Sequence, residues 1–453
     1  MKPNGPASAV FTAPCWTLLF QARRTSFYRQ ISEHLMLKRW RQNEFLSNVA
    51  ILFSGSTVAQ AIPILIAPLL SRLYLPDYFA ELAVFVSSYT ILSLAAGFRY
   101  DMAIMLPKTH REGVTLFFIT NILTLTTALI SAVVIFLFKD VIQNVFKLEG
   151  NGNWLYLIPV ALIVKNLVQS AFILNNRLKK FKRVAKSKVY QTIISSGVTV
   201  GLGLAGQASG LSLMAGKLSG LLQNAFYLTY RLKGEFKKHR YNRREARTLM
   251  KRYRFFPFFS VPNGFLNTLS VQLPSYLLLA YFDKNIAGLY AFSYRLIIAP
   301  LNLIAQSLRD VYFQRLAERH NEGTLTRKLL RVNYLKVFRV SIAPFIIGFL
   351  AAPYVFGPVF GARWAEAGVY VQIITPWLFM TFMNMPLTTL PAILNKQHVL
   401  LVYNTFLVIF RFLALWGGYT FFKDVHATLI LFSAVGVLFN LIYLKLVFKM
   451  VSA

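Results

Sequence analysis

Runs of apolar residues long enough to cross a bilayer recur from about residue 47 to the end of the chain. A transmembrane helix needs about 20 predominantly apolar residues, and short polar segments divide the chain into twelve such runs. The predicted spans are 47–71, 80–106, 113–138, 153–176, 189–208, 211–230, 255–281, 288–309, 340–357, 365–392, 399–421 and 428–448. Only a short turn, 207–210, separates the fifth span from the sixth, and fusing them would reverse the orientation of every later helix. We therefore predict an all-α integral membrane protein of about twelve transmembrane helices.

The composition agrees with this fold class. Of 453 residues, 56% are hydrophobic, 15% are aromatic and only 14% are charged, and the mean hydropathy is +0.51. Soluble globular proteins carry about 25% charged residues. The single cysteine, Cys15, excludes an intramolecular disulfide framework and a cysteine-based metal cluster.

The basic residues predict the orientation. The chain has 49 Lys and Arg against 16 Asp and Glu, a net charge of +33. With the N-terminus inside, 36 of these cations fall on the inner side, six on the outer side and seven within or at the edges of spans. Such a bias is typical of cytoplasmic loops, so both termini are expected in the cytoplasm. The basic clusters then serve as topology signals and contact anionic lipid headgroups, which argues against a nucleic-acid partner.

A basic loop between the sixth and seventh spans divides the chain into two sets of six. The expected organisation is a cytoplasmic N-terminal extension (1–46), a first lobe (47–230), the inter-lobe loop (231–254), a second lobe (255–448) and a cytoplasmic tail (449–453). Residues 1–35 have a mixed composition without a spanning run. We expect them to be either a disordered extension or absent from the native protein, with translation starting at Met36.

The two halves repeat a sequence pattern. Gln60–Pro63 in the first span corresponds to Gln272–Pro274 in the seventh. Ala80–Phe85 and Ala287–Phe292 both read Ala-x-Leu-x-x-Phe. With six spans in each repeat, the halves have the same orientation and are related by a pseudo-twofold axis along the membrane normal.

Four cations fall inside predicted spans. Lys165 and Arg411 lie near the middle of their spans, and Lys217 and Arg295 lie in the outer portions of theirs. A mid-span Lys or Arg costs about 2.5–3.5 kcal/mol on insertion scales, so it normally faces a wet cavity or a partner. The spans place no Asp or Glu at comparable depth. These cations therefore predict a cavity that binds an anionic substrate, with snorkelling or interhelical hydrogen bonding as the alternative.

Polar residues accompany these cations on the same helix faces. The supporting positions are Gln169, four residues after Lys165, Asn263 and Asn267 in the seventh span, and Asn302 and Gln306 in the eighth. Arg99 and Asp101 lie near the inner end of the second span. We interpret these two as an interfacial ion pair, a candidate inner gate, rather than as a substrate site.

Catalytic chemistry is not indicated. All six histidines fall in loops or in the N-terminal extension. Within the spans the sequence has no paired carboxylates, glycine-rich phosphate loop, metal-ligand spacing or Ser/His arrangement. We therefore expect that the protein is not an enzyme and that it binds no cofactor or metal.

Several segments resemble a known family of transporters. These are Phe98–Pro107, Ala287–Pro300, Phe360–Trp364 and Asn395–Gln397. Together with twelve spans in two halves, they look like the polysaccharide-transport (Wzx-like) oligosaccharide flippases of the MOP superfamily. The resemblance covers about residues 40–448 and implies two lobes around a cationic central cavity that work by alternating access.

The resemblance also implies a substrate and a location. Such proteins move a polyprenyl-pyrophosphate-linked oligosaccharide across the bacterial inner membrane, and a polysaccharide polymerase and export machinery are the implied partners. A MATE-type exporter of small molecules would share the fold, but its cationic substrates favour acidic residues in the spans. A lipid II flippase typically has fourteen spans, and a polymerase or ligase would have a large outer loop. The glycan, the oligomeric state and the coupling to a proton, sodium ion or membrane potential stay open.

Overall fold

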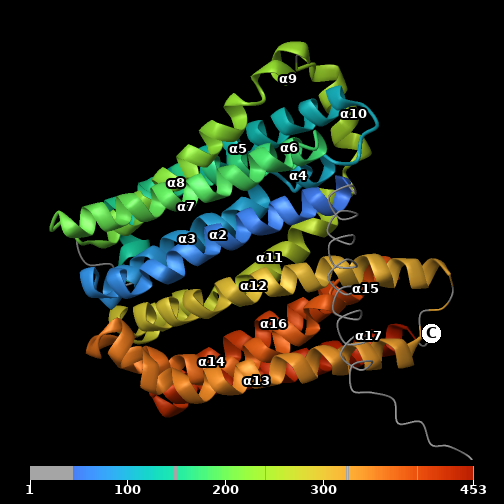
Figure 1. The fold of residues 1–453 in the computed structure, drawn as a ribbon. Helices are drawn as coiled ribbons and strands as arrows, with labels where there is room; N and C mark the ends of the chain where they lie inside the picture. Colours follow the sequence, from blue (N-terminus) through green and yellow to red (C-terminus); the bar gives the residue numbers. More distant parts are fainter. Residues whose placement is uncertain are drawn as a thin grey trace, which may run out of the picture. The chain divides into compact units, whose positions relative to one another are not determined.

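A computed structural model describes residues 44–145, 152–239, 241–322, 324, 326–394 and 396–451. The described elements are helices, and from Phe53 onward they belong to one unit (Figure 1). The first half contains α2 (Glu44–Leu73), α3 (Pro76–Ala96), α4 (Tyr100–Ala103), α5 (His110–Val145), η1 (Asn153–Tyr156), α6 (Leu157–Arg177), α7 (Phe181–Leu204) and α8 (Gly210–Tyr230). Then follow α9 (Lys233–Lys238) and α10 (Arg243–Arg252).

The second half repeats this pattern of long helices. It contains η2 (Phe256–Ser260), α11 (Val261–Tyr281), α12 (Lys284–Asn321), α13 (Arg327–Phe360), η3 (Ala362–Trp364), α14 (Ala365–Asn384), η4 (Met385–Leu387), α15 (Leu390–Ile393), α16 (Gln397–Gly417), η5 (Gly418–Phe422) and α17 (Val425–Met450). A long helix therefore covers most of each of the twelve predicted spans. The fold class predicted from the sequence, twelve membrane helices in two six-helix lobes, is confirmed.

The boundary between the fifth and sixth spans is a true turn. The chain leaves α7 at Leu204, and the Ser209 side chain accepts a hydrogen bond from the backbone N–H of Ser212 at the start of α8. A serine N-cap of this kind satisfies one of the free N–H groups of a helix start. Asp424 does the same for α17, where the N–H of Ala427 donates to its carboxylate and holds the pKa of Asp424 below its usual value. The ranges proposed for the N-terminal extension, lobes, loop and tail stay predictions.

Apolar side chains cover much of the outer surface of the helices. Leu65, Val340 and Tyr354 are each more than three-quarters exposed. Water would not stabilise such a surface, whereas lipid tails would. Eight helices in the described residues are long and apolar enough to cross a membrane; α7, α8, α11 and α14 fall outside that set and complete the twelve spans. The protein is thus a multi-pass membrane protein.

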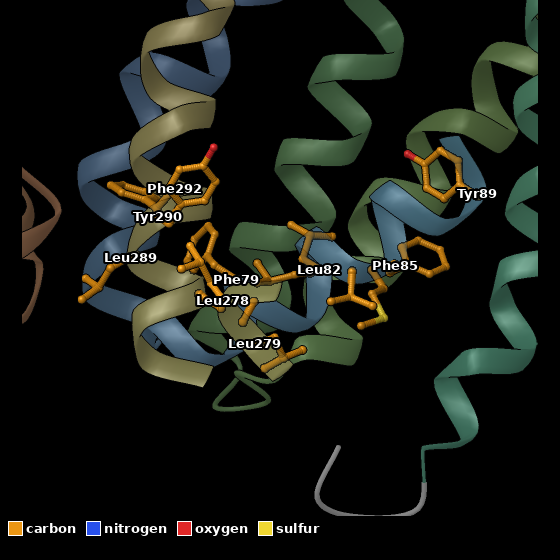
Figure 2. Packing of buried hydrophobic residues seen from close by; sticks show 14 of the residues in the cluster. Phe79, Leu82, Phe85, Tyr89, Leu278, Leu279, Leu289, Tyr290 and Phe292 are labelled. Atoms are coloured by element: carbon orange, nitrogen blue, oxygen red, sulfur yellow. The ribbon is translucent and has the colours of Figure 1, made fainter. Parts of the chain in front are cut away.

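A buried apolar core joins the two halves of the chain. Helix α3 packs against α12 and α11, and the repeated residues of both halves are buried in this core (Figure 2). The rings of Phe79, which precedes the repeated segment, and Phe292 meet edge to face with their centres 5.2 Å apart. Trp364 contacts both rings and donates its indole N–H to the carbonyl oxygen of Ser71, at 2.8 Å. The repeated residue Phe85 instead packs against Tyr89 and Trp154 within the first half.

Within each half the helices form their own contacts. Helices α5, α6, α7 and α8 lie side by side in the first half, and α13, α14, α16 and α17 do so in the second (Figure 1). The hydroxyl group of Tyr74, just after α2, donates to the carbonyl oxygen of Thr199 in α7, at 2.7 Å. These contacts fix the helices that carry the candidate site residues.

The segment 231–254 is ordered in the described residues and is fastened to α5. Arg111 pairs with Glu245 at 2.9 Å, and Glu112 pairs with Arg252 at 3.1 Å. Helix α5 contributes the arginine of the first pair and the glutamate of the second, and α10 contributes the other residue of each pair. The apolar face of α10 is buried beneath them through Ala246 and Leu249. The cations on its other face are left exposed.

We expect the double substitution Glu112→Lys, Glu245→Lys to loosen α10 without unfolding the protein. Each exposed ion pair is worth about 0.2–1 kcal/mol, and the change replaces two attractions by two repulsions. Amide hydrogen exchange of residues 243–252 should become up to about tenfold faster, with little change in melting temperature. Adding Arg111→Glu and Arg252→Glu restores opposite charges and serves as the control. Unchanged exchange in the double variant would contradict the pairing.

Candidate functional site

Two of the predicted cations line one cavity. Lys217 from α8 and Arg295 from α12 lie in its wall, and the rest of the wall comes from α2, α3, α7 and further residues of α12. We call this space, of about 250 Å³, the Lys217 cavity. Its other polar lining groups are Gln60 and Thr192, and apolar residues make up the remainder. The cavity therefore joins the two halves of the chain around two positive charges.

Lys217 and Arg295 have no protein counter-ion in the described part of the chain. Neither side chain makes a hydrogen bond or ion pair with a described residue, and the two are close enough for mutual electrostatic repulsion. The Arg295 side chain is exposed and lines the cavity wall. Two like charges at close range in a largely apolar wall favour an anionic ligand.

The surroundings of Lys165 differ from the sequence-based expectation. Asp101 lies near enough to interact electrostatically with both Lys165 and Arg99. Gln169 is within hydrogen-bonding reach of the same carboxylate, and Asp101 is only 8% exposed. The sequence predicted no acidic residue at the depth of Lys165. That prediction is wrong, because Asp101 lies close to Lys165. Lys165 lines neither of the two cavities described here.

A local break in the backbone brings Asp101 inward. Helix α3 ends at Ala96, and Phe98 and Arg99 then adopt left-handed conformations with φ of 49° and 59°. Non-glycine residues adopt this conformation uncommonly and at some energetic cost. The turn starts the short helix α4, on which Asp101 is buried. Arg99 is close enough to Asp101 for electrostatic attraction, while the predicted ion pair and its role as an inner gate stay predictions.

Arg411 lines a second cavity, made mainly by the second half of the chain. This space has a volume of about 480 Å³, and we call it the Arg411 cavity. Asparagine side chains are its most frequent polar lining groups: Asn263, Asn267, Asn384, Asn404 and Asn440. Arg99 from the first half also contributes to the wall. The four predicted cations thus do not gather in one space among the cavities described.

Arg411 is held by neutral groups. One terminal nitrogen donates to the hydroxyl group of Ser270 at 2.9 Å and to the carbonyl oxygen of the same residue at 3.3 Å. The guanidinium group lies against the rings of Trp377 and Phe432, at 4.6 and 4.9 Å from their centres. The side chain is 3% exposed, and no carboxylate of the described residues pairs with it. Cation–π contacts of this kind stabilise a desolvated guanidinium by about 2 kcal/mol or more.

The supporting polar residues separate into different places. Asn263 and Asn267 line the Arg411 cavity, where Asn263 accepts a hydrogen bond from Asn404 at 2.7 Å. Gln169 lies beside Asp101 instead. Asn302 is half-buried on α12 and lines neither cavity. The side chain of Gln306 lies outside the described residues.

Sequence reasoning missed several polar groups of these sites. Lys188 of α7 is electrostatically close to Lys165 and donates to the Ser56 hydroxyl group at 3.2 Å. Its position at the edge of a basic loop made it indistinguishable from a topology signal. Asn384 and Asn440 of the Arg411 cavity were also missed. They are isolated amides in apolar helices, and only the packing of α14 against α17 brings them together.

Comparison with known proteins gives the family. The sequence profile of the family described as "Polysaccharide biosynthesis protein" matches residues 69–369. This chain belongs to that family. The matched range includes Lys165, Lys217 and Arg295 but ends before Arg411. No curated protein sequence matches the chain.

Solved structures give the fold of this family member. A lipid II flippase, MurJ, in an inward closed conformation is similar with a TM-score of 0.63 and 13% identity, covering 90% of both chains. An inward-facing multidrug resistance MATE family transporter of the MOP superfamily has a TM-score of 0.59 and 12% identity, covering 89% of this chain and 97% of its own. A MATE in complex with MaD3S has a TM-score of 0.53 and 13% identity, covering 90% and 95%. The chain therefore has the fold that these MATE and MurJ structures share.

Proposed function

We propose that the protein is a flippase that moves a polyprenyl-pyrophosphate-linked oligosaccharide from the cytoplasmic to the periplasmic leaflet of the bacterial inner membrane. The glycan is a repeat unit of an O-antigen, exopolysaccharide or capsule. The observation that carries the proposal is the pair Lys217 and Arg295. These cations share one cavity between the halves of the chain without a partner among the described residues. The polysaccharide biosynthesis family supports a glycan as the cargo.

The chemistry of the pair suits a diphosphate. A guanidinium group can donate two parallel hydrogen bonds to phosphate oxygens, while an ammonium group acts as a compact point charge. A diphosphate offers negative charge on both phosphoryl groups and can contact both cations at once. A bound diphosphate offsets the repulsion between the positive charges of Lys217 and Arg295. The ligand and the two cations therefore stabilise each other.

The mechanism follows from where the cavity lies. A lipid-linked glycan cannot carry its charged diphosphate through hydrocarbon unaided, because burying unpaired charge is very costly. A site lined by residues of both halves can open to one side and then to the other when the halves rock against each other. The two halves would rotate about the contact between α3 and α12. The polyprenyl tail would stay in the lipid during this motion.

Other parts of the molecule fit the same proposal. The exposed cations of the 231–254 segment would contact anionic headgroups on the cytoplasmic side, with both termini on that side. A polysaccharide polymerase and export machinery would take the glycan after translocation. Rival functions fit less well: a cationic drug would be repelled by Lys217 and Arg295, and a polymerase or ligase needs catalytic groups that the sequence does not indicate.

Deleting the gene in its native bacterium tests the proposal. We expect one polyprenyl-pyrophosphate-linked oligosaccharide to accumulate on the cytoplasmic leaflet, identified by mass spectrometry of lipid extracts. Plasmid-borne wild-type protein should remove it and restore surface glycan. An unchanged lipid extract together with new sensitivity to cationic drugs would instead favour an exporter and reject the proposal.

A further inference from the structure

The Arg411 cavity has no part in the diphosphate site described above. Its lining residues and those of the Lys217 cavity do not overlap. Its volume of about 480 Å³ falls within the range of about 300–1,000 Å³ that is typical of small-molecule sites. A cavity of this size in the second half of the chain is large enough to hold a small ligand.

The lining contains groups that can bind a hydroxyl-rich molecule. Asn384 is 3% exposed, and its side-chain N–H donates to the side-chain oxygen of Asn440. The side-chain amide oxygen of Asn384, Oδ1, is buried without a hydrogen-bond partner. Asn267 is exposed and makes no hydrogen bond with a described residue. Each amide offers an acceptor and two donors, which matches the paired donors and acceptors of neighbouring sugar hydroxyl groups. Buried polar atoms without a partner are rare in proteins, and a ligand hydroxyl group or a water molecule can supply the partner that Asn384 lacks.

Aromatic rings line the same space. Trp377, Tyr403 and Tyr443 contribute to the wall, and the two tyrosine hydroxyl groups are already used by backbone carbonyl groups. Their rings therefore act as apolar faces rather than as hydrogen-bond donors. The half-buried ring of Tyr403 can present such a face to the C–H side of a pyranose ring, while the amides suit its hydroxyl edge.

Arg411 defines the charge of the ligand. It is 3% exposed, its Nε–H has no hydrogen-bond partner, and no described carboxylate pairs with it. Arg99 in the same wall also has a buried Nε–H without a partner. A planar guanidinium group binds a carboxylate with two parallel hydrogen bonds. One carboxylate on an otherwise hydroxyl-rich ring would therefore complete the site.

We propose that the Arg411 cavity binds an acidic sugar residue of the glycan, with its carboxylate on Arg411 and its hydroxyl groups on the asparagine side chains. This inference rests on the proposed function and adds a second subsite to it, which selects the sugar while the Lys217 cavity holds the diphosphate. The protein would then discriminate between glycans with and without a hexuronate-type residue.

A titration experiment tests the inference. The purified full-length protein in nanodiscs is titrated separately with free glucuronate, glucose and inorganic pyrophosphate. Fluorescence of Trp377, which lies on the Arg411 guanidinium group, should report glucuronate binding, and calorimetry should give its affinity. We expect glucuronate to bind at least tenfold more tightly than glucose. Equal affinity for the two sugars, or no binding of glucuronate, would overturn the inference.

Two variants locate the site. Arg411→Gln should weaken glucuronate binding at least tenfold. Because Arg411 also joins α16 to α11, Asn267→Leu provides a variant that breaks no hydrogen bond among described residues and should weaken binding at least threefold. Arg363→Gln, at an exposed position on the short helix η3, is the matched control. Unchanged glucuronate binding in folded Arg411→Gln or in Asn267→Leu would reject the site.

The two ligands separate this inference from the proposed function. Binding of glucuronate without binding of pyrophosphate would keep the sugar site and reject the diphosphate site. Binding of pyrophosphate without binding of glucuronate would support the diphosphate site and reject the sugar site. Binding of both, with glucuronate lost in Arg411→Gln, is the expected result.

Discussion

Replacing Lys217 and Arg295 together by glutamine should reduce glycan export at least 100-fold while the protein stays folded in the membrane. A hydrogen bond to a charged group contributes about 1.5–3 kcal/mol, and each 1.4 kcal/mol is a factor of ten in affinity. Loss of both cations therefore removes at least two factors of ten. Because neither side chain has a hydrogen bond or ion pair with a described residue, the change should leave the fold intact.

The measurement is the amount of surface glycan in a deletion strain that carries the variant. The matched control is Lys423→Gln with Arg363→Gln, which removes the same two residue types from exposed positions outside both cavities. The control should export normally. Full export by the Lys217→Gln, Arg295→Gln variant, at wild-type protein level, would contradict the assignment of the Lys217 cavity.

The single substitution Arg295→Lys indicates which property of the arginine matters. Lysine keeps the charge but loses the planar pair of donors. Export close to wild type would mean that Arg295 acts as a charge, and a loss comparable to Arg295→Gln would mean that it holds phosphate oxygens in a fixed geometry.

Gly288→Leu should prevent formation of a stable protein. A Cβ atom at Gly288 of α12 would overlap the carbonyl oxygen of Pro76 at the start of α3. Backbone on both sides leaves no flexible side chain to move aside, and overpacking of a well-packed contact typically costs 1–3 kcal/mol or more. Leucine adds three further carbon atoms to this overlap, so we expect little monodisperse protein after extraction and a much lower melting temperature.

Gly348→Leu is the matched control for this contact. Gly348 lies on α13, and a Cβ atom there would meet nothing within 4 Å. The same substitution should leave the yield unchanged or raise it, because leucine is a better helix former than glycine. Similar melting temperatures for the two variants would show that the α3–α12 contact is not as tight as described.

The helices could be predicted from the sequence because each depends on its own residues. A run of about 20 apolar residues crosses a bilayer whatever its neighbours are, and α7 and α8 separate at the predicted turn. The repeated Ala-x-Leu-x-x-Phe pattern predicted an internal duplication, and its residues are buried in both halves. Orientation and lobe boundaries stay predictions, since they depend on charges in loops rather than on contacts.

The arrangement of the cations could not be predicted, because it depends on which helices meet. Lys217 and Arg295 share a cavity although they lie on α8 and α12, and nothing in either segment identifies the other. Asp101 illustrates a second limit. The left-handed turn at Phe98 and Arg99 buries it beside Lys165, and neither left-handed position is a glycine that would identify this conformation in the sequence. Arg411 is buried, but its asparagine surroundings come from four separate helices.

Equilibrium binding of a polyprenyl diphosphate tests the central claim most directly. Native mass spectrometry of the purified protein with polyprenyl diphosphate, polyprenyl monophosphate and the free polyprenol compares ligands that differ only in charge. The account predicts retention of the diphosphate by the wild type, weaker retention of the monophosphate and none of the alcohol. It also predicts that the Lys217→Gln, Arg295→Gln variant loses the preference for the diphosphate. Equal retention of all three lipids, or an unchanged preference in that variant, would contradict it.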